Sequence, residues 1–146
     1  MTLQKTGAIS LHEIGAELGM SAPYDLRAMA AAAGMGTPDS IDEFYGFTKA
    51  VITNNGASTL YFNRIGVPVT TNAINVTSTV AFTVTTSGAI STAYVDPTSA
   101  SAGTVNIYFE CGSTNNSGSN KTNYVYFYDG YGVVRRTVTI VQLTTL

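Results

Sequence analysis

The spacing of apolar residues changes once along this chain. In the first third, apolar residues recur at helical spacing, as at Leu11, Ile14 and Leu18, which occupy positions i, i+3 and i+7. In the remainder they alternate with polar residues, which is typical of strands buried on one face. We therefore predict an α+β protein, with a small helical head over residues 1–48 and an antiparallel β-sandwich over residues 49–146.

Two short segments of the head carry the same helix-start signature. Residues 10–14 and 40–44 each place a serine three positions before a glutamate. In such a capping box the serine hydroxyl accepts a hydrogen bond from the backbone N–H three residues on, and the glutamate accepts one from the serine N–H. The first box predicts a helix of about two turns, and the second predicts a helix of one to two turns. Another helix between them should begin at Ser21 or near Pro23 and end at Gly34.

The body is expected to contain seven or so short strands separated by turns. Its alternating segments are rich in β-branched and aromatic residues, which favour strands. Residues 129–132, Asp-Gly-Tyr-Gly, predict a hairpin turn because glycine adopts positive φ angles readily. The polar segment 112–122 is too hydrophilic to pack, and we expect it to form a long exposed hairpin loop. The expected strands lie at residues 51–53, 59–62, 74–77, 79–85, 90–95, 105–109, 123–128 and 133–142.

Charged residues are scarce, and this scarcity excludes several classes of partner. The net charge is −2 and charged residues make up 11% of the chain, against about 25% in an ordinary soluble domain. Nucleic-acid binding needs a basic patch, yet the one adjacent basic pair, Arg135 and Arg136, would point to opposite faces of a strand. We expect no nucleic-acid partner.

The apolar runs of the chain are short. No apolar run approaches the ~20 residues that span a bilayer, so we expect no membrane partner either.

The residue types that carry catalysis or bind metals have simpler interpretations here. His12, the only histidine, is expected on the solvent-facing side of the first helix. Glu13 and Glu43 resemble a carboxylate pair for glycoside hydrolysis, but helix capping accounts for both. Cys111, the only cysteine, permits no intrachain disulfide and is expected to be a buried or loop-edge thiol in a protein made in the cytoplasm. We expect no enzymatic activity, no cofactor and no metal.

Three tyrosines alternate with apolar residues along one expected strand. Alternation places Tyr124, Tyr126 and Tyr128 on one face, where an aromatic stripe suits a protein surface or a sugar ring. Two interpretations remain open: the stripe packs against the head or a neighbouring subunit, or it forms a ligand surface. The strand also lacks the charge or proline that commonly protects a sheet edge. We therefore expect repeated copies of the chain to contact one another, as a homo-oligomer or a lattice.

Parts of both regions resemble known protein modules. Residues 9–19, 24–27 and 38–47, with their Ile-Ser-Leu, Glu-Leu-Gly and Phe-Tyr-Gly sequences, resemble an N-terminal anchoring segment of bacteriophage virion proteins. Residues 95–105 and 136–142 resemble the immunoglobulin-like modules called BACON domains. The first resemblance implies docking on a phage particle, and the second implies an immunoglobulin-like sandwich. The residues expected to dock are apolar or aromatic positions of the head: Leu11, Ile14, Leu18, Leu26, Ile41, Phe44, Tyr45 and Phe47.

The resulting hypothesis is a non-enzymatic structural protein of a phage virion. It would act as a head fibre, a capsid decoration or a tail attachment component, with other virion proteins as its partners. The alternative is a carbohydrate-binding module for adsorption to the host, in which the tyrosines or the Asn-rich loop contact a surface glycan. A glycan screen separates the two hypotheses, because a purely structural component should bind no glycan.

Overall fold

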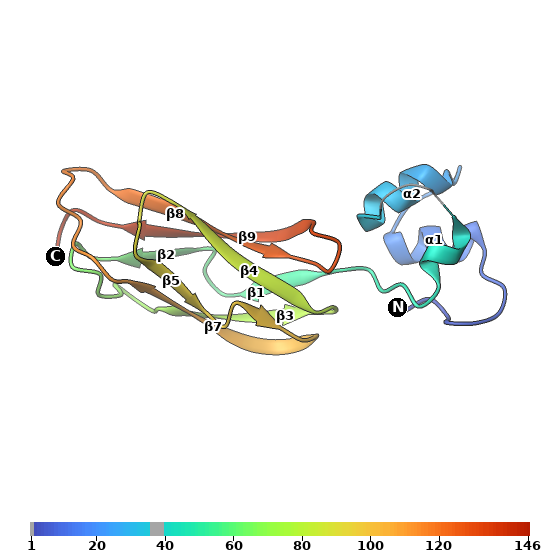
Figure 1. Ribbon diagram of the computed structural model, residues 1–146, viewed down its shortest axis with the longest axis horizontal. Helices are drawn as coiled ribbons and strands as arrows, with labels where there is room; N and C mark the ends of the chain where they lie inside the picture. Colours follow the sequence, from blue (N-terminus) through green and yellow to red (C-terminus); the bar gives the residue numbers. More distant parts are fainter. Residues whose placement is uncertain (1, 36–39) are drawn as a thin grey trace.

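Two hydrophobic cores organise the computed structural model, which describes residues 2–35 and 40–146. A small helical head lies at one end of two β-sheets, and a single linker joins the head to the sheets (Figure 1). The core of the head and the core between the sheets share no residue. The chain is therefore α+β and mostly β, as the change of apolar spacing predicts.

The first capping box is present at the start of helix α1 (Leu11–Leu18). The Glu13 Oε2 atom accepts a hydrogen bond from the Ser10 N–H at 2.7 Å, and the Ser10 hydroxyl accepts one from the Glu13 N–H at 3.3 Å. The helix ends at Gly19, whose φ of 71° is left-handed. Sequence reasoning placed both ends of this helix correctly.

The second helix begins later than the sequence predicts. Helix α2 (Leu26–Ala33) is capped by Asp25, whose Oδ1 atom accepts from the Ala28 N–H at 3.0 Å. Of the two predicted starts, Ser21 was wrong, whereas the start near Pro23 lies two residues before the cap, because the Asp25 carboxylate is the group that accepts from a free N–H of the first turn. The predicted end at Gly34 is confirmed.

The third helical segment, η1 (Ile41–Phe44), is a single 3₁₀ turn. The Glu43 side chain of the second capping box lies outside the described residues, so this box stays a prediction. The N-terminal arm closes the head beside this turn, because the Leu3 N–H donates to the Phe47 carbonyl at 2.8 Å. Thr2 and Thr48 form an isolated β-bridge next to that bond. The head core contains Leu3, Ile9, Ile14, Leu18, Met29, Ala30, Ala33, Phe44 and Phe47.

The body consists of a four-stranded and a five-stranded sheet that share one core, as a sandwich requires. Alternate residues of each strand face this core, which confirms the two-residue period. The first sheet has the order β1 (Ile52–Asn55), β3 (Ala73–Ser78), β7 (Gly103–Cys111) and β5 (Ala93–Asp96). The second has the order β2 (Thr59–Phe62), β9 (Val134–Gln142), β8 (Lys121–Tyr128), β4 (Phe82–Gly88) and β6 (Ser99–Ala100).

Three features of the sheets differ from the prediction. Strand β2 pairs with β9 in parallel, so the sandwich is mixed and not wholly antiparallel. The reason is that the chain changes sheets between β1 and β2, which brings β2 beside the last strand in the same direction. The two-residue strand β6 is too short to leave a pattern in the sequence. Strand β4 begins at Phe82, so Val80 lies before it and is half-buried.

The long polar segment after β7 is not a hairpin loop. It carries the chain from β7 in one sheet to β8 in the other, and the side chain of Asn115 within it is buried. The Asn115 Nδ2 atom donates to the carbonyls of Ser119 at 2.9 Å and Gln142 at 3.2 Å, and its backbone N–H donates to Arg64 at 2.8 Å. These bonds satisfy the polar groups of Asn115, the buried residue of the segment, while most of its other residues are exposed as predicted.

Candidate functional site

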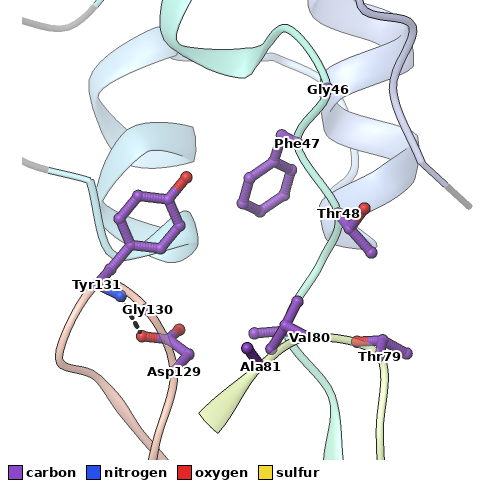
Figure 2. Close-up of a pocket in the computed structure, with 10 residues that line it drawn as sticks. Gly46, Phe47, Thr48, Thr79, Val80, Ala81, Asp129, Gly130 and Tyr131 are labelled. Atoms are coloured by element: carbon purple, nitrogen blue, oxygen red, sulfur yellow. Dashed lines mark hydrogen bonds between the residues drawn. The ribbon is translucent and has the colours of Figure 1, made fainter. Parts of the chain in front are cut away.

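A cavity of about 390 Å³ lies where the head meets the sandwich. Three segments form it: the linker at residues 46–50, the turn at residues 79–81 and the tip of the β8–β9 hairpin at residues 129–131. Phe47 and Tyr131 stand on opposite sides of the opening, with their ring centroids 6.5 Å apart (Figure 2). This is the place where residues of both parts of the chain converge.

The one carboxylate of the cavity belongs to Asp129, and its hydrogen bonds hold the hairpin. The Oδ1 atom accepts from the backbone N–H groups of Tyr131 at 2.9 Å and Val133 at 3.0 Å. The Oδ2 atom pairs with Arg135 Nε at 2.7 Å, and the Asp129 side chain is 1% exposed. The predicted hairpin at residues 129–132 is confirmed, and the carboxylate that builds it is engaged on both oxygens.

The threonines of the cavity are also bonded within the protein. The Thr79 hydroxyl donates to the Lys49 carbonyl at 2.7 Å and accepts from the Val51 N–H at 2.9 Å. The Thr48 hydroxyl lies 2.9 Å from that of Thr2. With these polar groups engaged, the cavity offers mainly apolar surface to a ligand or partner. Its chemistry suits packing, and it presents no arranged acid, base or nucleophile.

The head residues predicted to dock lie in three environments. Ile14, Leu18, Phe44 and Phe47 belong to the core of the head, so their side chains hold the head together. Leu11, Leu26 and Ile41 are half-buried and pack against that core. Tyr45 is 36% exposed, and its hydroxyl donates to the Gly7 carbonyl at 2.6 Å. Direct contact with a partner remains a prediction, and the residues with accessible surface for it are Leu11, Leu26, Ile41 and Tyr45.

The predicted tyrosine stripe lies on the outer face of the five-stranded sheet. Tyr124 is 47% exposed, whereas Tyr126 and Tyr128 are half-buried. Consecutive rings in the stripe lie 6.4 Å and 6.3 Å apart between centroids, so each ring covers part of the next. The head contacts the adjoining hairpin tip instead, through Tyr131. Contact of the stripe with a neighbouring subunit or a ligand stays open.

A second aromatic surface lies on the outer face of the four-stranded sheet, and sequence reasoning did not select it. Tyr94 and Tyr108 are 56% and 48% exposed, and they lie diagonally across the β5–β7 pair. Beside them, three amides form a ladder in which Asn55 donates to Asn75 at 2.8 Å and Asn75 donates to Asn106 at 2.9 Å. The alternation of these strands contained the signal, because it places both tyrosines on the face opposite the core.

The remaining chemical groups lie apart from the cavity. His12 is exposed, with its Nδ1 atom 3.1 Å from the Tyr24 hydroxyl. Cys111 is buried as predicted, and burial raises the pKa of its thiol to about 11. The hydrogen bonds from Ser10 lower the pKa of the Glu13 carboxyl. Across residues 2–35 and 40–146 no group of three or more His, Cys, Asp and Glu is placed to hold a metal ion.

Helices of the described ranges are all too short or too polar to cross a membrane. Comparison with protein-family models found no match. Comparison with curated protein sequences also found none.

Among solved structures, the chain is similar to a Bacteroides ovatus GH5 xyloglucanase in complex with a XXXG heptasaccharide. The TM-score is 0.51 at 15% identity, over 63% of this chain and 18% of that one. This likeness concerns the fold alone and spans a small part of the xyloglucanase. The chain is also similar to WR4, a C. elegans MSP family member, with a TM-score of 0.43 at 11% identity, over 66% of this chain and 99% of that one.

Proposed function

We propose that this chain is a non-enzymatic structural protein of a bacteriophage virion, attached to the particle by its helical head. The observation that carries the proposal is the head itself, which has its own core and stands at one end of the sandwich on a single linker. The resemblance of residues 1–48 to phage anchoring segments supports the same role. The sandwich, which we propose to be immunoglobulin-like, then faces outward or contacts neighbouring subunits.

The polar groups described above support a role without catalysis. Asp129, the buried carboxylate of the cavity, is bonded on both oxygens, and the Cys111 thiol stays protonated at neutral pH because burial raises its pKa to about 11. A nucleophile or general base needs a free lone pair near its working pH. Head fibre, capsid decoration and tail attachment component all fit this description.

Particle incorporation tests the proposal. Phage particles assembled with a chain that lacks residues 1–48 should contain none of it, whereas the full chain should co-purify in repeated copies. The control is Tyr94→Ala, which removes an exposed ring of β5, a strand that lies away from the head (Figure 1), and should leave incorporation unchanged. Incorporation of the headless chain at the level of the full chain would refute attachment through the head.

The expected contact between copies has a separate test. Tyr126→Arg places a charge in the middle of the tyrosine stripe, so light scattering should show loss of oligomers if that stripe is buried between copies. Tyr108→Arg places the same charge on the other sheet and serves as the control. A parent protein that is strictly monomeric, and isolated from other copies on the particle, would refute self-contact.

The alternative function, binding of a host surface glycan, is favoured by the surface around Tyr94 and Tyr108. Exposed aromatic rings beside side-chain amides suit a sugar ring, which has an apolar face and a rim of hydroxyls. A glycan array should then give hits that Tyr108→Ala abolishes and Thr85→Ala on the other sheet retains. An array with no hits would refute glycan binding, and the structural role would be the one remaining proposal.

A further inference from the structure

Both helices of the head end toward the sandwich, and both ends receive a cation from outside the helix. A helix C-terminus carries partial negative charge, and basic residues in its last turn commonly neutralise it. Neither α1 nor α2 has a basic residue there. Instead Lys49 Nζ in the linker donates to the Leu18 carbonyl at 2.9 Å, and Arg135 Nη2 in strand β9 donates to the Ala33 carbonyl at 3.1 Å.

The Arg135 side chain is held in position before it reaches the head. Its Nε atom pairs with the buried Asp129 carboxylate at 2.7 Å, and its Nη2 atom remains available to donate to the Ala33 carbonyl at the end of α2. A planar guanidinium can make both bonds at once, whereas a lysine ammonium has no such fork. The neighbouring Arg136 turns to a different partner, the Ser58 hydroxyl at 2.8 Å, within the sandwich.

The linker is fastened on both sides at Lys49. Toward the head, its backbone N–H donates to the Glu17 carboxylate at 3.1 Å, in addition to the Nζ bond. Toward the sandwich, its carbonyl accepts from the Thr79 hydroxyl at 2.7 Å. One residue of the linker is therefore bonded to both parts of the chain.

The end of α2 and the hairpin tip are also in close contact. A Cβ atom added at Gly34 would lie 2.5 Å from Val133 Cγ2 and 3.3 Å from Tyr131 Cβ. Both distances are shorter than ordinary carbon contacts, which lie near 3.5–4.0 Å. The hairpin and the helix can approach this closely because residue 34 is a glycine.

We propose that these contacts form a latch that fixes the head at one orientation relative to the sandwich. The latch consists of Lys49, Arg135, Asp129, Thr79 and Gly34. When it is closed, the molecule is a rigid rod, and docking of the head sets the direction of the sandwich. When it opens, the head swings about the linker while both cores stay folded, because the cores share no residue. This inference holds whichever particle or partner the head binds.

Distances between spin labels test the latch in the full chain. Labels at Ala32→Cys on α2 and Thr85→Cys on β4, both exposed positions, report the orientation of the head in a Cys111→Ala background. The unsubstituted latch should give a single narrow distance distribution. Arg135→Gln and Gly34→Ala should each broaden or shift it, since one removes the guanidinium and the other introduces the collision with Val133.

Two controls separate the latch from general destabilisation. Arg136→Gln removes the adjacent guanidinium, and Gly118→Ala introduces the same left-handed strain where nothing lies within 4 Å. Both should keep the narrow distribution. Hydrogen exchange on each variant shows whether the amides of both cores remain protected, and only variants that pass this check are compared. If the head of Gly34→Ala is unfolded, the Arg135→Gln variant provides the test. A broad distribution in the parent, or an unchanged narrow one in a folded Arg135→Gln variant, would overturn the latch.

Discussion

Replacing Phe44 with alanine should unfold the helical head and leave the sandwich folded. The Phe44 side chain is 0% exposed in the core of the head, and its ring packs edge-to-face on Phe47 with centroids 5.8 Å apart. The sixteen buried residues of the core between the sheets form a separate cluster that does not include Phe44. The effect of the substitution should therefore stop at the linker.

The expected loss is comparable to the whole stability of the head. Truncation of a buried phenylalanine costs about 3–5 kcal/mol, which includes the lost transfer free energy and the cavity left behind. At the stability per residue that is typical of folded proteins, the total free energy of unfolding of a 48-residue unit is about 2–7 kcal/mol. The head should consequently be unfolded, or close to it, at 25 °C, while the free energy of unfolding of the sandwich changes little.

Hydrogen exchange read by mass spectrometry resolves the two parts directly. In Phe44→Ala the amides of α1 and α2 should lose protection while those of β3, β7, β8 and β9 keep it. Phe127→Ala, an equally buried phenylalanine in the sandwich, is the matched control and should deprotect the strands. If Phe44→Ala instead deprotects strands and helices together, the chain is one cooperative domain and the division near residue 48 is wrong.

Three further predictions concern individual side chains. Ile107→Ala should lower the free energy of unfolding of the isolated sandwich by roughly 2–4 kcal/mol in urea denaturation, whereas Thr83→Ala on the outer face should have a much smaller effect, and similar losses would contradict the strand alternation. Ser10→Ala should raise the pKa of Glu13 toward its ordinary value in an NMR titration, because the hydrogen bonds from Ser10 lower that pKa. In the parent, the stabilisation from this capping box is present above pH 4.5 and is lost as the pH falls further, because the carboxylate becomes protonated. The Cys111 thiol should react with a thiol reagent far more slowly in the folded protein than in urea at pH 8, and stability should decline as pH rises from 9 toward 11 because the unfolded chain ionises first.

Local patterns in the sequence determined the elements of this protein. The capping box at Ser10 and the glycines at 19 and 34 fix helix ends through bonds within one or two turns of chain, so they can be read without the fold. Alternation placed eight of the nine strands for the same reason, since the two-residue period of a strand is local. The buried faces of those strands followed directly.

Only the tertiary structure decided which elements meet. The parallel pairing of β2 with β9 joins segments about eighty residues apart, and no local pattern encodes that register. The bonds from Arg135 to Ala33 and from Lys49 to Leu18 likewise span 102 and 31 residues. A sequence shows that a basic side chain is present, but the tertiary fold decides which carbonyl group that side chain meets. For this reason the helices and strands could be predicted, whereas the junction that joins head to sandwich could not.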